Sequence, residues 1–357
     1  MIKKAALTFQ VRAGWLKDMK LSLILITAVN AVVPVVLMIL IGYALKKAGF
    51  FTKEFIRIGN KLVFNLCLPC MLFINVYNIE GFASINWNIV SYAVAVLLVI
   101  FCFGYFTAVL TSKVPERRGV ILQCTFRSNM AIIGLSLASA LGSEEAVAVA
   151  AIVSSFAVPV TNVLSVFALS MFVNDGQKGS VRKVFINIAK NPLIISVLLG
   201  MLCLGVREVQ RAAFGEVVFA FNNQTKFLYT VVNNLKAIAT PFALLILGGQ
   251  FEFSAMKGLL KEISVGTVWR IVIAPLLALG GAIWLSSAGL LACGINEYPA
   301  LIALFGSPVA VSSAVMASSM KADEQLATQL VVWTSIFSVF TIFAEVCVLM
   351  SMGLLAV

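Results

Sequence analysis

Ten long apolar segments separated by short polar links dominate this chain of 357 residues. A helix that crosses a membrane needs about 20 consecutive apolar residues. With 61% hydrophobic and only 11% charged residues, the chain lacks the polar surface that a soluble fold requires. We therefore predict an all-α, multi-pass protein of the cell membrane, with the lipid bilayer as its surroundings. The ten predicted spans cover residues 22–45, 59–78, 88–111, 120–141, 146–173, 192–206, 226–250, 264–287, 299–320 and 326–355.

The net charge of +11 arises from Lys and Arg residues that lie mostly in the links. The links after the first, third and fifth spans are basic, whereas those after the second and fourth carry Glu but neither Lys nor Arg. Under the positive-inside rule, the odd-numbered links are cytoplasmic. The basic stretch 1–21 disagrees with this orientation and is treated as a separate extension. This pattern indicates membrane anchoring, so no nucleic-acid partner is predicted.

The second half of the chain repeats features of the first half in the same order. Pro34 to Gly42 resembles Pro192 to Gly200, and the fourth and ninth spans align at a constant offset of 179 residues, which pairs Ser128 with Ser307. Five spans are an odd number, so the second copy must be inverted, as in many secondary transporters. The predicted units are the extension 1–21, repeat one over 22–173, a cytoplasmic linker over 174–191 and repeat two over 192–357. The sixth span looks short, and 208–225 is interpreted as a polar or interfacial link.

The fourth and ninth spans hold the candidates for solute binding, because they are unusually rich in small and hydroxyl residues. Such residues permit close helix packing, or they mark a broken helix whose free backbone groups meet a solute. Arg127 offers a fixed cation with several donors that suits a carboxylate; alternatively, it belongs to the cytoplasmic cluster with Arg117 and Arg118 and snorkels to the membrane interface. The predicted binding residues are Arg127, Ser128, Asn129, Ser136, Ser307, Pro308, Val309, Ser312 and Ser313.

Other polar or helix-distorting residues lie within the apolar spans. Glu345, in the middle of the tenth span, is a candidate for proton coupling, or it pairs with a cation such as Arg270 or Lys236. Buried amides such as Asn162 are expected to form interhelical hydrogen bonds. The candidates in the second and seventh spans are Asn65, Pro69 and Pro241.

Several chemistries are excluded by what the sequence lacks. There is no His, which removes His-based zinc sites and the usual Ser-His and Cys-His nucleophile pairs. No P-loop or H-E-x-x-H motif occurs. We therefore predict no metal, no cofactor and no enzymatic activity. A channel or facilitator of the same architecture is the alternative to a carrier.

Several motifs resemble those of the auxin efflux carrier family. Leu68-Pro-Cys-Met-Leu-Phe73 resembles its second-span signature, and residues 127–134 resemble its fourth-span motif. Residues 306–313, followed by Asp323, Ala327 and Gln329, resemble its ninth-span motif. The resemblance extends from about residue 24 to the end. The short central loop is similar to that of prokaryotic members, some of which are described as malate or malonate permeases.

The resemblance implies two inverted five-helix repeats that work as an elevator. Helices 1, 2, 6 and 7 would form a scaffold and a homodimer contact, and helices 3–5 and 8–10 a mobile core. Unwound segments at Ser128–Asn129 and Pro308–Val309 would cross and hold a small organic anion. This would be a mono- or dicarboxylate such as malate or malonate, or an auxin-like aromatic carboxylate. Family prolines are absent at Ser128 and Ser136, so the break in helix 4 is expected to depend on Gly134 and on Ser and Asn side chains.

Overall fold

The computed structural model describes residue 26 and residues 33–79, 86–134, 137–138, 141, 143–172 and 190–355. These residues form helices and no regular β-strand. Seven helical stretches among them are long and apolar enough to cross a membrane, so the chain is a multi-pass membrane protein. They are Lys53–Tyr77, Trp87–Thr111, Glu145–Phe172, Pro192–Phe214, Lys226–Gln250, Leu260–Ser287 and Glu324–Ser351.

The first half of the chain begins, in its described part, with helical residues 33–47. A kinked span follows, made of α2 (Lys53–Leu62), the π-helical turn η1 (Val63–Cys67) and α3 (Leu68–Tyr77). Next come α4 (Trp87–Thr111), α5 (Pro115–Phe126), the π-helical turn η2 (Met130–Gly134) and α7 (Glu144–Phe172).

The second half contains α9 (Pro192–Phe214), α10 (Phe221–Gln224), α11 (Lys226–Gln250) and the 3₁₀ turn η3 (Phe253–Gly258). A second kinked span consists of α12 (Leu260–Val268), η4 (Trp269–Ile273) and α13 (Ala274–Ser287). It is followed by α14 (Tyr298–Leu301), η5 (Ile302–Gly306), α15 (Ser312–Ser319) and α16 (Glu324–Ser351).

Three of the ten predicted spans are not among these seven, for identifiable reasons. The first span is described only from residue 33 onward apart from residue 26, so its full length is not established. The fourth and ninth spans are each interrupted near their middle, at 127–129 and 307–311, so neither forms one long helix. The count of ten therefore stays a prediction.

The sixth span corrects the sequence interpretation, because α9 is a full-length helix that extends to Phe214, through the first seven residues of the expected polar link. Its polar residues are satisfied along the helix: Arg211 Nη1 lies 2.6 Å from Glu208 Oε1, one turn away. Arg207 Nη1 donates a hydrogen bond of 2.6 Å to the carbonyl oxygen of Tyr77 on α3. Gly215 ends the helix with a left-handed backbone, φ 78°, which is the usual helix C-terminal signal.

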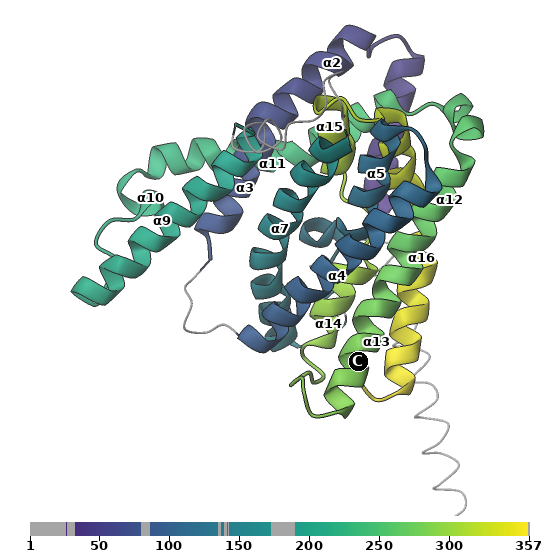
Figure 1. The fold of residues 1–357 in the computed structure, drawn as a ribbon. Helices are drawn as coiled ribbons and strands as arrows, with labels where there is room; N and C mark the ends of the chain where they lie inside the picture. The colour runs from purple at the N-terminus through teal and green to yellow at the C-terminus, as the bar shows by residue number, and fades with distance from the viewer. Residues whose placement is uncertain are drawn as a thin grey trace, which may run out of the picture.

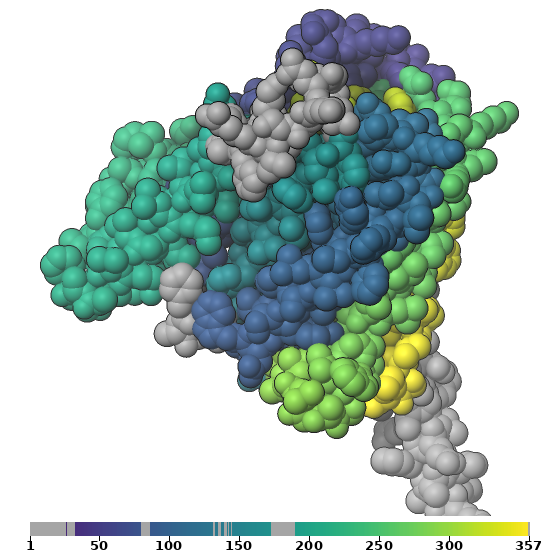
Figure 2. All heavy atoms as spheres, in the orientation of Figure 1, coloured from purple at the N-terminus to yellow at the C-terminus, as the bar shows by residue number. Residues whose placement is uncertain are grey.

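The helices pack as two groups (Figure 1). In one group, α3 packs against both α9 and α11. In the other, α5 contacts α4, α7, α12 and α16, and α15 also packs on α16. Figure 2 shows α9 to α11 projecting from one side of the molecule, next to the compact body formed by the second group. The two groups meet where α7 and α15 approach α3 and α11.

Contacts between links show at which end of the bundle each link lies. At one end, Lys46 Nζ lies 3.2 Å from Glu252 Oε1, and Lys261 Nζ donates to the carbonyl oxygen of Thr111. At the other end, Asn296 Nδ2 donates to Glu145 Oε2. Links after predicted spans one, three and seven thus gather at one end, and those after spans four and eight at the other, as alternating crossings require.

Candidate functional site

Two interrupted helices cross at the centre of the second group. Between α5 and η2 the chain is extended at Ser128, which forms an isolated antiparallel bridge with Val309. The backbone N–H of Asn129 donates to the carbonyl oxygen of Pro308 at 2.8 Å, and that of Ala310 donates to Arg127 at 3.3 Å. These segments are the ones that the family resemblance placed at a crossing.

The fourth predicted span breaks after α5 without a proline because the other interrupted segment satisfies its backbone. Arg127 leaves the helix with φ −85° and ψ 105°, and the groups freed there bond to the segment around Pro308. Pro308 itself has no N–H and is disfavoured inside a helix. The interruption at 127–129 precedes Gly134, which is the last residue of η2, so the expected contribution of Gly134 to the break stays a prediction. A β-carbon at Gly134 would collide with the carbonyl oxygen of Ala303, so this glycine lets η2 approach η5 closely.

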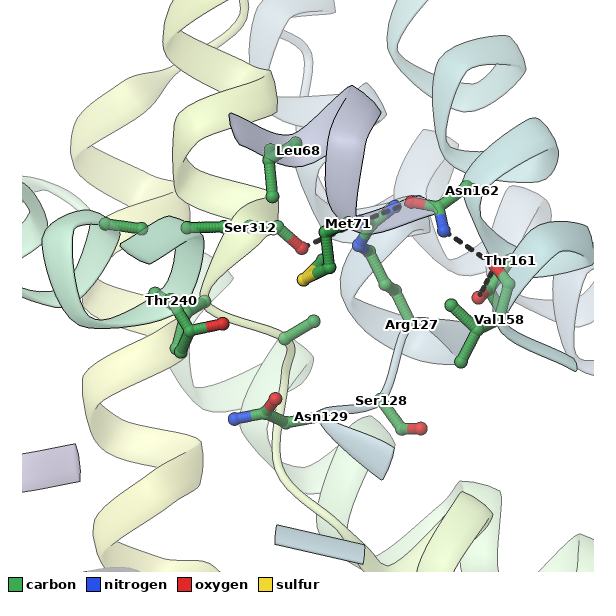
Figure 3. Close-up of a pocket in the computed structure, with 14 residues that line it drawn as sticks. Leu68, Met71, Arg127, Ser128, Asn129, Val158, Thr161, Asn162, Thr240 and Ser312 are labelled. Carbon is green, nitrogen blue, oxygen red and sulfur yellow. Dashed lines mark hydrogen bonds between the residues drawn. The ribbon is translucent and has the colours of Figure 1, made fainter. Parts of the chain in front are cut away.

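A cavity of about 50 Å³ lies beside the crossing, between the two groups of helices (Figure 3). From the first group, Leu68 and Met71 of α3 and Thr240 of α11 line it. From the second group, α7 contributes Thr161 and Asn162. The remaining lining residues are Val158, Ala239, Ala243, Ala310, Val311 and the predicted site residues Arg127, Ser128, Asn129 and Ser312.

Arg127 is the charged residue that lines this cavity, and only 4% of its surface is exposed. Its Nη2 donates to Asn162 Oδ1 at 2.7 Å and to Ser312 Oγ at 2.8 Å. Its Nε and Nη1, like Nδ2 of Asn129, are buried and have no hydrogen-bond partner among the described residues. Arg127 therefore does not belong to a cluster with Arg117, which binds Glu262 and Asp323 at one end of the bundle. Because buried donors without partners are unfavourable, this arrangement suits an incoming acceptor.

Other predicted site residues support the crossing without lining the cavity. Ser307 is fully buried and donates from Oγ to the carbonyl oxygen of Ala303 at 2.6 Å. Pro308 and Val309 take part through their backbone, and Ser313 is buried behind them. Ser136 lies outside the described residues.

The three scaffold-side candidates do not line the cavity either. Asn65 is exposed and donates to the carbonyl oxygen of Lys61, one turn back on its own helix. Pro69 and Pro241 are each next to a lining residue, Leu68 and Thr240 respectively. Sequence reasoning missed Met71, which lies within the second-span motif, and Thr240, which is next to the candidate Pro241. Asn162, expected to form an interhelical hydrogen bond, forms it with Arg127 and also lines the cavity.

Glu345 lies apart from the cavity that Arg127 lines. Its carboxylate packs against Gly306, at the end of η5, and neither oxygen accepts a hydrogen bond from a described residue. Of the two cations considered for it, Arg270 is the one whose positive charge interacts electrostatically with this carboxylate. Arg270 itself donates to carbonyl oxygens of the crossing helices. In the described ranges, no group of three or more Cys, Asp or Glu is arranged to hold a metal ion.

Comparison with known proteins finds one matching family model and similar archaeal transporters. A family model described as "Membrane transport protein" matches residues 27–344, which include the crossing and the cavity. An uncharacterized transporter of Methanothermobacter thermautotrophicus is 22% identical over 339 residues, covering 90% of this chain and 98% of that protein. An uncharacterized transporter of Methanocaldococcus jannaschii is 21% identical over 318 residues, covering 88% and 96%.

Proposed function

Because the chain belongs to the membrane transport protein family, we propose that it is a secondary transporter that moves a small organic anion across the cell membrane by alternating access. The observation that carries this proposal is the state of Arg127. It is a buried cation whose Nε and Nη1 have no partner in the described part of the chain, and it faces a cavity between two groups of helices.

The charge around Arg127 favours an anion. No carboxylate among the described residues lies within ion-pair distance of its guanidinium. Ser312, which accepts a hydrogen bond from Arg127, is the first residue of α15, and the N-terminal end of a helix carries a partial positive charge. A carboxylate would accept hydrogen bonds from Nε and Nη1 of Arg127, and Asn129 and Thr240 are neutral hydrogen-bonding residues that line the same cavity.

The cavity supports a small substrate. A volume of about 50 Å³ leaves little more room than one or two water molecules need. Any organic anion therefore requires the two groups of helices to separate, and the required separation grows with the size of the anion. A short mono- or dicarboxylate such as malate or malonate would require less separation of the two groups than an auxin-like aromatic acid.

The position of the cavity supports an elevator mechanism. One wall comes from α3 and α11, which belong to the proposed scaffold, and the other from α7 and the crossing, which belong to the proposed core. Two features also support inverted repeats. The breaks at Ser128 and Ser307 coincide at the 179-residue offset. The same offset relates Arg117 to Asn296, and each binds an acidic residue at the start of a long helix: Asp323 before α16 and Glu145 in α7, which are 178 residues apart.

Glu345 is the proposed site of proton coupling. Its carboxylate is buried within the membrane-spanning bundle, and Arg270 is the charged group that acts on it. Intramembrane acids of this kind are typical of proton pathways. Replacing Glu345 by Gln should abolish acceleration of uptake by a pH gradient while leaving exchange of labelled for unlabelled substrate intact. Uptake by the variant that still follows the gradient would exclude Glu345.

The anion site is tested by thermal stability of the purified chain with malate, malonate, succinate, lactate, indole-3-acetate and neutral analogues. A ligand at 100 times its dissociation constant stabilises the folded state by about 2.7 kcal/mol. We expect small carboxylates to raise the unfolding temperature of the wild type. This increase should be lost in Arg127→Gln and kept in the control Arg57→Gln, whose side chain is largely exposed. No shift with any anion in a folded protein would contradict the substrate class.

Counterflow in proteoliposomes separates the carrier from the alternative channel or facilitator. Substrate loaded on the inside should accelerate entry of labelled substrate through a carrier, because the loaded site returns faster or exchanges its ligand. A simple pore shows no such stimulation. Flux without saturation or counterflow would favour the channel.

A further inference from the structure

Arg270 is a fully buried cation within the bundle, and it has no part in the proposed anion site. It lies in η4, between α12 and α13, and its relative exposure is 0%. Its Nε donates to the carbonyl oxygen of Ser307 at 2.9 Å, and its Nη2 donates to Leu304 at 2.8 Å and Phe305 at 2.9 Å. Its Nη1 reaches the carbonyl oxygen of Thr125 at 3.4 Å.

These carbonyl groups belong to the ends of two different helices. Leu304 and Phe305 lie in the last turn of η5, and Thr125 lies in the last turn of α5. The carbonyl groups of a last helical turn have no partner within their own helix. Each helix C-terminus carries about half a negative charge. The two ends together thus present about one negative charge to one guanidinium.

Glu345 adds a carboxylate at the same place. Its Oε2 packs against Gly306, the residue between two of the carbonyl groups that Arg270 binds. Both carboxylate oxygens are buried without a hydrogen-bond partner among the residues described. Without Arg270, this point would combine backbone carbonyl oxygens with a carboxylate whose two oxygens are buried. Such oxygen donors are the preferred ligands of hard cations, and broken transporter helices use carbonyl groups in this way.

We propose that Arg270 is the resident cation of the crossing, occupying the position at which these helix ends would otherwise bind a small cation from solution. It is a positioning residue, because it holds the two helix ends together. None of the four residues to which it donates hydrogen bonds lines the Arg127 cavity. The inference concerns the empty transporter and holds for any transported anion. Its test needs no substrate, so its failure is distinguishable from failure of the anion proposal.

Thermal unfolding of the full chain in matched chloride salts tests this assignment. The wild type should unfold at the same temperature in sodium, potassium and choline chloride. Arg270→Ala should unfold at a lower temperature and recover part of the loss with sodium, or with guanidinium well below denaturing concentrations. Choline is too large to enter and should not restore it. The double variant Arg270→Ala with Glu345→Gln should lose most of this cation response.

Two further variants distinguish the proposal from a purely structural role. Arg117→Ala removes another arginine of the second group, one bound to carboxylates at the end of the bundle, and should show no specific recovery with sodium. Arg270→Lys keeps the charge and should show no stabilisation by sodium.

Three results would overturn the proposal. The first is stabilisation of the wild type by sodium over choline that Glu345→Gln abolishes. The second is an Arg270→Ala variant that folds but responds to no cation. If Arg270→Ala does not fold, Arg270→Lys decides: we expect it to fold without a sodium response, and a clear sodium response, or failure to fold, would be the third contrary result.

Discussion

Arg127 and Arg270 reach the same helix crossing in opposite hydrogen-bonding states. The Arg270 guanidinium donates to four carbonyl oxygens at the carboxyl ends of the broken helices. Arg127 uses only Nη2, toward Asn162 and Ser312, and its Nε and Nη1 find no partner in the described chain. One arginine therefore has protein acceptors for all of its guanidinium nitrogens, whereas the other has two nitrogens without a partner among the described residues.

Arg127→Lys should bind the substrate anion about ten-fold more weakly, a loss of about 1.4 kcal/mol. Lysine keeps the positive charge but lacks the planar fork that binds a carboxylate through two donors. Titration calorimetry with the best carboxylate measures the change. The exposed Arg57 serves as the matched control, because Arg57→Lys should leave affinity unchanged. Wild-type affinity in Arg127→Lys would show that the fork does not hold the anion.

Gly134→Ala should destabilise the protein by about 1–3 kcal/mol, the usual range for overpacking a core. A β-carbon there meets the carbonyl oxygen of Ala303, which is backbone and cannot turn aside. The matched control is Gly205→Ala in α9, where no atom beyond the adjacent residues and the backbone of its own helix lies within 4 Å of the added carbon. That change should be neutral or stabilising, by up to about 1 kcal/mol, because Ala favours helix. Equal unfolding midpoints for both variants would contradict the close approach of η2 and η5.

The motifs of the broken helices could be found from the sequence because their chemistry is local. Arg127, Ser128 and Asn129 are polar residues in an apolar span, and Pro308 interrupts another. The match to the family confirms the resemblance that these residues suggested. The pairing of Ser128 with Val309 joins segments 181 residues apart, and it was implied only by that resemblance.

The remaining walls of the cavity depend on tertiary packing that periodicity does not encode. Met71 and Thr240 reach the cavity because α3 packs on α11, whereas the conspicuous Asn65 points away from it and bonds to its own helix. The length of α9 was underestimated for a similar reason. Its charged residues looked like a link, but Arg207 and Arg211 have partners at Tyr77 and Glu208 that let the helix continue.

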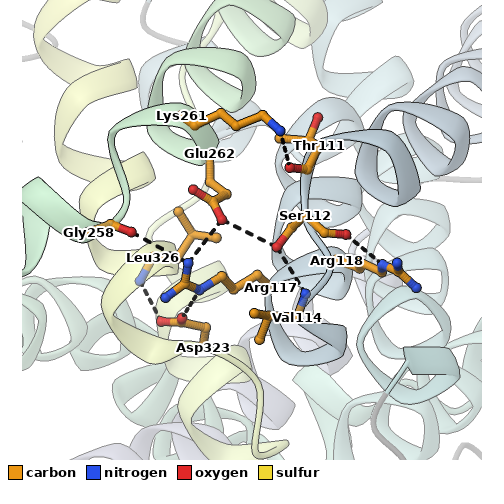
Figure 4. A network of polar contacts seen from close by, with 10 residues as sticks. All are labelled: Thr111, Ser112, Val114, Arg117, Arg118, Gly258, Lys261, Glu262, Asp323 and Leu326. Atoms are coloured by element: carbon orange, nitrogen blue, oxygen red, sulfur yellow. Dashed lines mark hydrogen bonds and ion pairs between the residues drawn. The ribbon is translucent and has the colours of Figure 1, made fainter.

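Arg117→Gln should destabilise the protein by about 2 kcal/mol, between the values for exposed and fully buried ion pairs. Arg117 joins three elements at one end of the bundle (Figure 4). Its Nη1 lies 3.0 Å from Glu262 Oε1, and its Nε lies 3.1 Å from Asp323 Oδ2. Asp323 also caps α16 by accepting from the N–H of Leu326. Removing the guanidinium leaves two partly buried carboxylates without their cation.

Denaturant unfolding of Arg117→Gln, Glu262→Gln and the double variant measures this coupling. The two single losses should add to more than the loss in the double variant, because both remove one interaction. The exposed pair of Arg57 and Glu54 is the control, and Arg57→Gln should change stability by no more than about 0.5 kcal/mol. Strict additivity of Arg117→Gln and Glu262→Gln would show that their contact contributes nothing.

Two side-chain contacts distinguish movement between the helix groups from movement within one of them. Asn60 Nδ2 on α2 lies 3.3 Å from Ser318 Oγ on α15, so this contact joins the proposed scaffold to the proposed core. Ser143 Oγ lies 3.1 Å from Asn296 Oδ1, and both residues belong to the proposed core. An elevator changes the first contact and preserves the second, because the core moves as a unit against the scaffold.

Cross-linking Asn60→Cys to Ser318→Cys should therefore stop transport, and reduction should restore it. The matched pair Ser143→Cys with Asn296→Cys should still transport after cross-linking, because its bond lies within one moving unit. Uptake by oxidised and reduced proteoliposomes gives the measurement, and each single-cysteine variant controls for reaction of the seven native cysteines. Substrate binding in the locked Asn60–Ser318 variant would show that the site is intact and only its movement is blocked. Full transport through that variant, with the cross-link verified, would exclude relative sliding of α2 and α15 and leave a channel as the better account.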